Sequence, residues 1–367
     1  MKIAFFVVKN IERGGGIEKY TLELGRRLTA RGHEVTLYSM AHYGDVVGKV
    51  HGMTVVKVPS IWHPALEKLS ASAAAALHLV FIAPKYDIVH CHSVASGAFA
   101  PLLALRQKRC LLQMHGIEWQ RSRWNFLGRS LLKLLETISL ASNRYLTAVS
   151  QTQCDYYHDT RGVQMRYIPT GAEVKERVPA QEIFSLGLEA KRYILFASRL
   201  VPEKGAHYLI SAFRRIATDY KLVIAGDVKG EGGYKETLNS LSGGDPRILF
   251  PGYVEGRLLE ELFAHAAVYV QPSEIEGLSI ALLEAMSYGN CCLVSDIPEN
   301  REALADTGFT FRNKDIEHLK DQLEKILGFP EEDRESWGRL ARTRVERHYS
   351  WDHVADEFEG YYRVVSH

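Results

Sequence analysis

The chain has 367 residues, 46% of them hydrophobic, and a formal net charge of +1. This length is typical of two domains of ordinary size. The sequence contains no run of eighteen apolar residues, so no membrane-spanning helix is expected. Five cysteines without paired spacing indicate buried thiols rather than a zinc site or a disulfide framework. The expected location is therefore the reducing cytoplasm.

The charge is divided unevenly along the chain. Residues 1–175 hold 22 Lys and Arg against 12 Asp and Glu, a net +10, whereas residues 176–367 hold 23 against 32, a net −9. A basic half indicates an anionic partner, such as a phospholipid surface, a lipid diphosphate or a nucleic acid. Complementarity between the two halves is the alternative. The absence of a recognition motif in the sequence argues against nucleic acid.

The first half alternates apolar runs with helical patterns. Residues 3–8 form a continuous apolar run, which is typical of a strand buried on both faces. A glycine-rich turn follows, and then a helix is expected with Ile17, Tyr20, Leu24 and Leu28 on one face. Further strands are expected at residues 35–38, 87–92 and 110–114. The alternation predicts a parallel sheet in a doubly wound α/β domain.

The second half repeats this pattern, with strands expected at residues 193–197, 222–225, 248–250, 268–271 and 292–295. The linker is placed between Pro169 and Pro179, where the apolar pattern stops. We therefore expect two doubly wound Rossmann-like domains, residues 1–175 and 176–350, facing each other across a cleft. The pattern of residues 351–367 predicts an amphipathic helix. The pattern does not indicate which surface this helix packs against.

Residues that directly follow the strands are the candidates for a site, because ligands bind outside the carboxyl ends of parallel strands. Arg199 and Lys204 follow the strand expected at residues 193–197. Arginine offers a planar fork of donors and lysine a point charge, so this pair suits a diphosphate. Two solvated surface cations are the alternative. Gly14, Gly15 and Gly16 follow the first strand, where glycines let backbone N–H groups approach an anion or simply form a tight turn.

The stretch SEIEGLSIALLE, residues 273–284, follows another strand. Gly277 permits a tight turn, and a helix is expected from about Leu278 to residue 288. The N–H groups of Leu278, Ser279 and Ile280 would then cap a phosphate.

Glu276 and Glu284 lie eight residues apart, which is roughly 12 Å of helix and too far to share a proton. Two acids near a diphosphate suit hydroxyl groups, so they indicate a nucleotide sugar with one acid at each of its sugars.

This arrangement resembles the signature of the retaining GT-B glycosyltransferases of family 4, in which an E-x7-E motif follows an Arg and a Lys. The resemblance covers nearly the whole chain and includes Gly15-Gly16-Ile17-Glu18, Val149-Ser150, Ile168-Pro169-Thr170-Gly171, Phe250-Pro251-Gly252-Tyr253-Val254 and Tyr349-Ser350-Trp351. One departure is Thr170, where the family usually has Asn. Because that position is not catalytic, the assignment stands.

The resemblance implies roles for particular residues. Arg199 and Lys204 would bind the donor diphosphate, Glu284 the ribose hydroxyls and Glu276 the transferred sugar. The backbone near Val254 would hold the nucleobase. His115 matches the family histidine beside the reacting centre, where it would orient and polarise rather than attack. The loop with Gly15 and Gly16 would close over donor and acceptor.

The implied activity is transfer of a hexose, with retention, from a nucleotide-diphosphate sugar to a hydroxyl of a glycan or lipid-linked acceptor. No D-x-D sequence occurs, so neither a metal nor another cofactor is expected. The family also predicts that the helix over residues 351–367 crosses back onto the N-terminal domain. A nucleotide-sugar 2-epimerase of the same architecture is the alternative.

Two further patterns in the sequence give indications about the acceptor. Residues 115–124 are similar to a segment of bacterial rhamnosyl- and related transferases that build surface polysaccharides, although Trp119 and Trp124 suit core packing equally well. Residues 121–138 combine basic and apolar side chains and predict an amphipathic helix that lies on a membrane. A helix packed on its own domain is the alternative. We expect peripheral contact with the inner face of the plasma membrane and a polyprenyl-diphosphate-linked acceptor.

Overall fold

The computed structural model describes residues 1–11, 15–44, 47–63, 66–107, 109–121, 124–176, 178–227 and 233–366. It divides into two compact units. Unit 1 contains residues 1–170 and the helix that begins at Trp351, and unit 2 contains Gly171–Ser350. Gly14 of the expected glycine turn and Arg123 of the expected basic helix lie outside the described residues.

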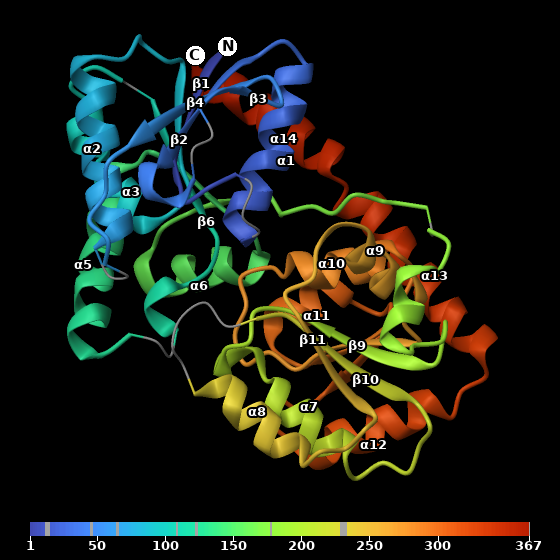
Figure 1. The fold of residues 1–367 in the computed structure, drawn as a ribbon. Coiled ribbons are helices and arrows are strands. Elements are labelled where there is room, and N and C mark those ends of the chain that lie inside the picture. The colour runs from blue at the N-terminus through green and yellow to red at the C-terminus, as the bar shows by residue number, and fades with distance from the viewer. Residues whose placement is uncertain are drawn as a thin grey trace. The chain divides into compact units, whose positions relative to one another are not determined.

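Unit 1 is a doubly wound α/β unit (Figure 1). Its strands are β1 (Lys2–Val8), β2 (Glu34–Met40), β3 (Gly48–Val50), β4 (Met53–Val58), β5 (Ile88–Cys91), β6 (Cys110–Met114), β7 (Tyr145–Ala148) and β8 (Arg166–Tyr167). Its helices are α1 (Gly16–Ala30), α2 (Glu67–Phe81), α3 (Val94–Gly97), α4 (Ala100–Leu103), α5 (Phe126–Ser142), α6 (Gln151–Arg161) and α14 (Trp351–Ser366), with 3-10 turns at Ala41–Tyr43 and Glu118–Gln120. The sheet order is β3-β4-β2-β1-β5-β6-β7-β8, and only the β3–β4 pair is antiparallel among the described strand pairs.

Both faces of the unit 1 sheet are buried, as the apolar run of β1 predicts. Ala4 and Phe6 pack into one core with residues of α2 and α5, whereas Ile3 and Phe5 pack into a second core with α1 and α14. Figure 1 shows α2, α3 and α5 on one side of this sheet and α1 and α14 on the other. The two-residue period of a strand therefore explains why the whole run is apolar.

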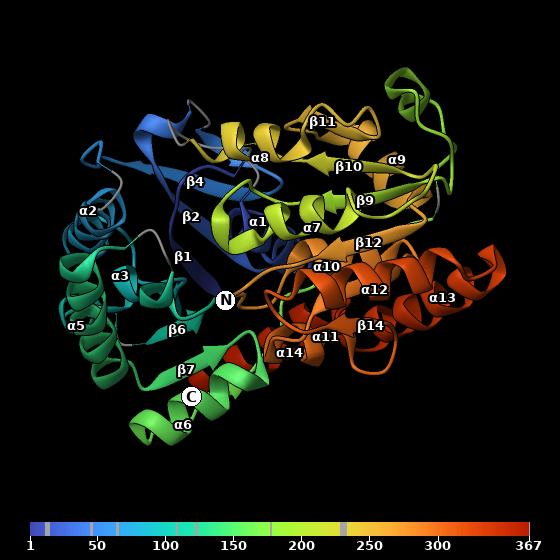
Figure 2. The ribbon, with the colours of Figure 1, turned by 90° about the horizontal axis from the view of Figure 1, so that it is seen from below.

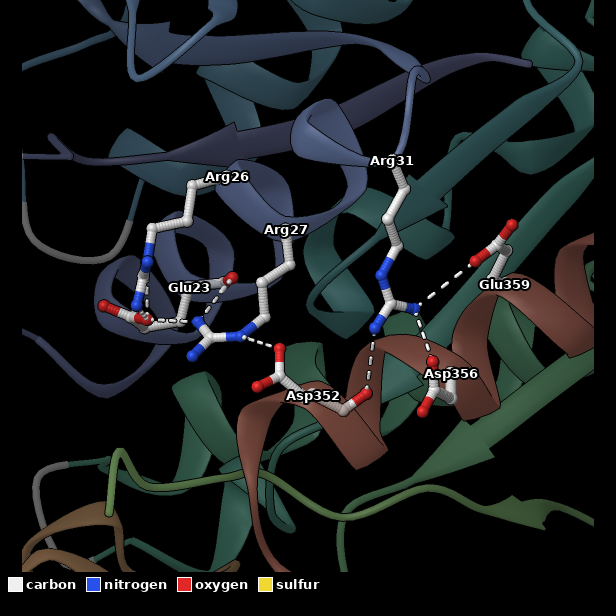
Figure 3. Close-up of polar contacts among 7 residues, drawn as sticks. All are labelled: Glu23, Arg26, Arg27, Arg31, Asp352, Asp356 and Glu359. Atoms are coloured by element: carbon white, nitrogen blue, oxygen red, sulfur yellow. Dashed lines mark hydrogen bonds and ion pairs between the residues drawn. The ribbon is translucent and has the colours of Figure 1, made fainter. Parts of the chain in front are cut away.

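Helix α14 is part of the unit 1 core although it ends the chain. Trp351, Phe358 and Tyr362 are fully buried in the core that also contains α1. Polar contacts line the same interface (Figure 3): Arg27 Nε lies 2.9 Å from Asp352 Oδ1, and Arg31 Nη1 lies 2.7 Å from Asp356 Oδ1. The helix adds four acids and one arginine to the net +10 of residues 1–170, so unit 1 carries +7 and unit 2 carries −6.

Unit 2 has the same architecture (Figure 2). Its strands are β9 (Tyr193–Ala197), β10 (Lys221–Ala225), β11 (Ile248–Gly252), β12 (Val268–Gln271), β13 (Cys291–Ser295) and β14 (Phe309–Phe311). Its helices are α7 (Ala206–Phe213), α8 (Tyr234–Ser242), α9 (Gly256–His265), α10 (Ile280–Ser287), α11 (Pro298–Leu304), α12 (Ile316–Leu327) and α13 (Glu331–His348), with 3-10 turns at Glu182–Leu186 and Pro202–Lys204. The sheet is wholly parallel, in the order β11-β10-β9-β12-β13-β14.

Candidate active site

The strand order of unit 2 predicts a ligand site at the carboxyl ends of β9 and β12. From β9 the chain adds β10 and β11 on one side, and it then returns to add β12, β13 and β14 on the other. The order reverses between β9 and β12, and ligands bind doubly wound sheets at that reversal, outside the carboxyl ends of the strands. Arg199 and Lys204 follow β9, and Glu276 to Ile280 follow β12. The predicted phosphate and sugar residues thus lie at one end of two neighbouring strands.

Glycine allows the two loops to touch. Gly205 has φ +73°, and a Cβ atom there would lie 2.0 Å from the carbonyl oxygen of Pro272. Two residues after Pro272, the N–H of Glu274 donates a hydrogen bond of 2.8 Å to the carbonyl oxygen of Glu203, which lies two residues before Gly205. A side chain at position 205 would force the loops apart. The loop that carries Lys204 is therefore fixed against the loop that leads to Glu276.

Lys204 and Glu276 form an ion pair at this end of the sheet. The Nζ atom of Lys204 lies 2.5 Å from Oε1 of Glu276, and the two side chains are only 13% and 8% exposed. A charge-assisted hydrogen bond of this kind holds both groups in one geometry, and its desolvation makes either partner costly to remove alone. The lysine expected at a diphosphate and the acid expected at a sugar are thus adjacent.

The helix after β12 begins later than the sequence predicts. Leu278 and Ser279 were expected within the helix, but α10 begins at Ile280. Ser279 is its N-cap, with extended backbone (φ −78°, ψ 113°) and a side chain that accepts a hydrogen bond from the N–H of Leu282. A serine hydroxyl satisfies one free N–H of the first turn and so ends the helix there. Gly277 and Leu278 are buried in the preceding turn.

A buried polar network that sequence reasoning missed supports this turn. The hydroxyl of Ser279 donates to Oε1 of Gln271 at 2.7 Å, and Nε2 of Gln271 donates to Oδ1 of Asn300 at 2.8 Å. Asn300 in turn bonds Ser295, whose hydroxyl donates to the carbonyl oxygen of Ser273. Gln271 is a polar residue at the end of the otherwise apolar strand β12. This polar position is the signal in the sequence from which the network could have been predicted. The network holds the loop between β12 and α10 in one conformation.

The other predicted residues of unit 2 lie around the same edge of the sheet. Arg199 is exposed in the loop after β9, and Val254 is half-buried two residues after β11. Glu284 is half-buried on α10. Glu299, which sequence reasoning did not single out, lies in the first turn of α11, after β13. Burial and the negative charge of Glu276 raise the pKa of the Glu299 carboxyl to about 7.

The predicted residues of unit 1 follow the strands of the other sheet. Gly15 is the N-cap of α1 and Gly16 its first residue. Glu18 lies in the first turn of this helix, where its Oε1 accepts a hydrogen bond from the N–H of Lys9 at 3.4 Å. His115 directly follows β6 and is half-buried, with its Nε2 atom buried. Burial holds the pKa of this imidazole well below its ordinary value, so the ring is neutral.

The segment expected on a membrane is only partly helical. Helix α5 begins at Phe126, capped by Asn125, so Arg121 precedes it and pairs with Glu118. Trp119 and Trp124 pack against the core, as the alternative interpretation holds. Leu132, Leu135 and Leu140 bury one face of α5. The opposite face exposes large apolar side chains, namely Phe126 (81%), Leu127 (75%), Leu131, Leu134 and Ile138.

Within the described residues, no group of three or more His, Cys, Asp or Glu side chains is arranged to hold a metal ion. No helix in the described ranges is long and apolar enough to cross a membrane. The five cysteines are free thiols, and Cys91, Cys154, Cys291 and Cys292 are buried.

Solved structures of other proteins have the same fold. The chain superposes on a sucrose-phosphate synthase from Thermosynechococcus elongatus with a TM-score of 0.86 at 20% identity, over 99% of this chain and 98% of that chain. It superposes on Anabaena Alr3699/HepE in complex with UDP-glucose with a TM-score of 0.80 at 17% identity, over 98% of both chains. The fold is GT-B, as predicted.

The family follows from the sequence models. Residues 14–176 match the model described as Glycosyltransferase Family 4, and residues 180–344 match Glycosyl transferases group 1. The chain belongs to the glycosyltransferase family that these two models describe, which confirms the resemblance to that family in the sequence.

Curated relatives agree with this assignment. An uncharacterized glycosyltransferase of Methanocaldococcus jannaschii is 26% identical over 96% of this chain and 95% of its own length. A phosphatidyl-myo-inositol mannosyltransferase of Mycolicibacterium smegmatis is 23% identical over 100% and 94%. The sulfoquinovosyl transferase of Arabidopsis thaliana is 26% identical over 89% of this chain but 66% of its own length. These relatives do not favour the epimerase alternative.

Proposed function

We propose that this glycosyltransferase transfers a hexose, with retention of configuration, from a nucleotide-diphosphate sugar to a hydroxyl of a glycan or lipid-linked acceptor in cell-surface polysaccharide synthesis. The observation that carries the donor assignment is the Lys204–Glu276 pair at the point where the strand order of unit 2 reverses. A cation and an acid held together there can bind the diphosphate and the sugar of one donor.

Each predicted residue has a role in this proposal. Arg199 and Lys204 stabilise the negative charge that develops on the leaving diphosphate. The N–H groups that begin α10 at Ile280 add to that stabilisation, since they carry the positive end of the helix dipole. Glu284 accepts hydrogen bonds from the ribose, Glu276 from the transferred sugar, and the backbone near Val254 holds the base. Arginine and lysine perform the charge neutralisation, so the proposed reaction is metal-independent.

The acceptor side of the reaction belongs to unit 1 in this proposal. The loop at Gly15 and Gly16 covers the reacting groups, and the neutral imidazole of His115 orients and polarises the sugar. The acceptor hydroxyl attacks on the face that the diphosphate leaves, and the departing phosphate oxygen takes its proton. The bond from the anomeric carbon to the diphosphate breaks as the bond to the acceptor oxygen forms, which conserves the anomeric configuration.

Calorimetric titration with UDP, GDP and dTDP, first without metal and then with Mg²⁺, tests the donor site. UDP is the first choice because structurally similar proteins have been solved with UDP and UDP-glucose. We expect one nucleotide to bind without metal and Arg199→Ala to weaken it at least tenfold. Arg215→Ala removes an exposed arginine at the end of α7 and serves as the matched control. Equal effects of the two variants would contradict the assignment of Arg199.

Retention is tested on the product itself. Proton NMR during turnover reports whether the new glycosidic bond keeps the anomeric configuration of the donor. Inversion would refute the same-face mechanism while leaving the donor site intact.

The exposed apolar face of α5 supports peripheral attachment to an anionic membrane. Phe126 and Leu127 are mostly exposed, and unit 1 carries the positive charge of the molecule. Apolar side chains would enter the interface while basic groups attract anionic lipid headgroups. We expect vesicles with phosphatidylglycerol to sediment the protein at low salt and release it at high salt. Leu127→Asp should abolish binding, whereas Leu340→Asp, at an exposed leucine of unit 2, should not.

A further inference from the structure

Unit 1 contains a buried cluster of polar rings, and the proposed function gives a role only to His115 among them. The histidine cluster consists of Tyr20 on α1, His90 and His92 at the end of β5, His115 after β6, and Trp351 at the start of α14. Tyr20 and His92 are 0% and 1% exposed. The ring of Tyr20 lies 4.6 Å from that of His115 and 5.7 Å from that of His92, between ring centroids.

The cluster holds more polar atoms than protein partners. Both ring nitrogens of His92, Oη of Tyr20, Nε2 of His115 and Nε1 of Trp351 are buried, and no group among the described residues hydrogen-bonds them. His90 is satisfied at one nitrogen only: its Nδ1 lies 2.6 Å from Oη of Tyr362, whereas its buried Nε2 has no hydrogen-bond partner among the described residues. Buried polar groups are almost always hydrogen-bonded, since an unpaired one retains its full desolvation cost. Several such atoms on rings that pack against one another therefore indicate a shared partner.

The chemistry of these atoms identifies that partner. Burial lowers the pKa of His90, His92 and His115, so the imidazoles are neutral. A neutral imidazole presents one donor and one acceptor, a tyrosine hydroxyl presents both, and an indole presents a donor. Water, which donates and accepts, satisfies all of them, whereas an ion would match only one kind.

We propose that the histidine cluster binds ordered water and that His92, through this water, positions the ring of His115. The water joins the nitrogens of His92 to Oη of Tyr20 and to Nε2 of His115. The hydrogen bond at Nε2 then selects the tautomer of His115, and with it the atom that the accessible edge of the ring presents to substrate. Trp351 closes the cluster from α14, at 5.7 Å from the ring of Tyr20. The catalytic consequence rests on the proposed function, but the water site does not.

Substitution of tyrosine by phenylalanine tests for the water without any ligand. Tyr20→Phe is compared with Tyr38→Phe, a fully buried tyrosine of the same unit whose Oη already bonds Nδ1 of His78 at 3.0 Å. If water satisfies Oη of Tyr20, both variants lose a hydrogen bond, and each melting temperature falls by about 1–3 °C. A higher melting temperature for Tyr20→Phe would show an unhydrated hydroxyl and overturn the water site.

The positioning of His115 is tested by NMR on histidine labelled with ¹⁵N, with His115→Gln used to assign the signal. We expect a single tautomer of His115 in the natural protein and a mixture in His92→Phe. His92→Gln keeps a donor and an acceptor and should restore the single tautomer. The same tautomer in all three proteins would refute the positioning role, even if His92→Phe is less stable.

Kinetics separate this inference from the function on which it rests. With the nucleotide sugar that the natural protein turns over, His92→Phe should lower kcat about tenfold and leave the donor KM within about twofold, because misorientation affects the chemical step. His92→Gln should recover most of that loss. An unchanged kcat in His92→Phe would overturn the catalytic part. If the natural protein turns over no nucleotide sugar, the proposed function fails, and the melting and NMR results still decide the water site.

Discussion

The ammonium group of Lys204 lies 2.5 Å from a carboxylate oxygen of Glu276, and the two residues come from the loops that follow β9 and β12. The pair neutralises two buried charges in the absence of donor. A diphosphate that binds Lys204 must therefore share or replace this contact. Under the proposed function, the same pair contributes to the stability of unit 2 and to the affinity for the donor.

Removing one partner should separate these two contributions. Lys204→Met leaves the carboxylate of Glu276 buried without its partner, so we expect a loss of about 3 kcal/mol in unfolding free energy. The double variant Lys204→Met/Glu276→Leu removes both charges and should regain most of that stability. Both variants should bind nucleotide diphosphate at least tenfold more weakly. Urea unfolding and calorimetric titration measure the two quantities, and a double variant no more stable than the single one would contradict the pairing.

The contact between the two site loops predicts a specific effect of alanine at position 205. Gly244→Ala is the control, because Gly244 has nearly the same φ (+72°) as Gly205 but no atom within 4 Å of the added Cβ. We expect it to cost about 1 kcal/mol, the usual penalty for alanine at positive φ. Gly205→Ala should cost about 2 kcal/mol more, since the Cβ also meets the carbonyl of Pro272. It should weaken nucleotide binding as well, and equal stability losses would show that the loops separate freely.

The docking of α14 should depend on the arginines of α1 (Figure 3). Arg31→Ala removes the contacts with Asp356 and Glu359, so amide hydrogens of α14 should exchange faster. Arg26→Ala is the matched control, because Arg26 pairs with Glu23 on its own helix. Added salt should reduce the difference, since the side chain of Asp356 is 69% exposed and its ion pair with Arg31 is therefore screened. Exchange that is unchanged in Arg31→Ala would assign the docking to apolar contacts alone.

The raised pKa of Glu299 predicts a pH-dependent contribution to stability. The folded state keeps this carboxyl protonated up to about pH 7, whereas the unfolded chain releases the proton near its ordinary pKa of 4.5. Between these values the folded state binds more protons, so the contribution is complete below the unfolded pKa and is lost as pH rises through 7. The difference in unfolding free energy between the natural protein and Glu299→Gln should change by about 1–3 kcal/mol across this window. A constant difference would refute the shift.

Strands buried on both faces were predictable because a continuous apolar run leaves little choice. The residues expected for β9 and β12 are those observed. By contrast, β7 (YLTA) and β14 (FTF) were missed. In the sequence, runs of three or four residues that include threonine cannot be distinguished from loops. Only their pairing with neighbouring strands identifies them as strands. Propensity alone also placed the start of α10 too early, at Leu278, because the capping role of Ser279 was not recognised.

The residue types of the candidate site were predictable, but their contacts were not. Lys204 and Glu276 are 72 positions apart in the chain, and only the neighbouring positions of β9 and β12 bring them together. The network of Gln271 and Asn300 depends in the same way on strands that are distant in sequence. Local pattern reports which side chains follow a strand, whereas strand order decides which of those side chains meet.

The membership of α14 in unit 1 has a consequence for synthesis on the ribosome. Unit 2 is one continuous segment and has all its residues once Ser350 has emerged, whereas the core of unit 1 still lacks Trp351, Phe358 and Tyr362. Domains usually complete folding in the order in which they are made. Here the first unit to be translated is the last to be completed, and until then the apolar face of α1 that later packs on α14 is open to chaperones.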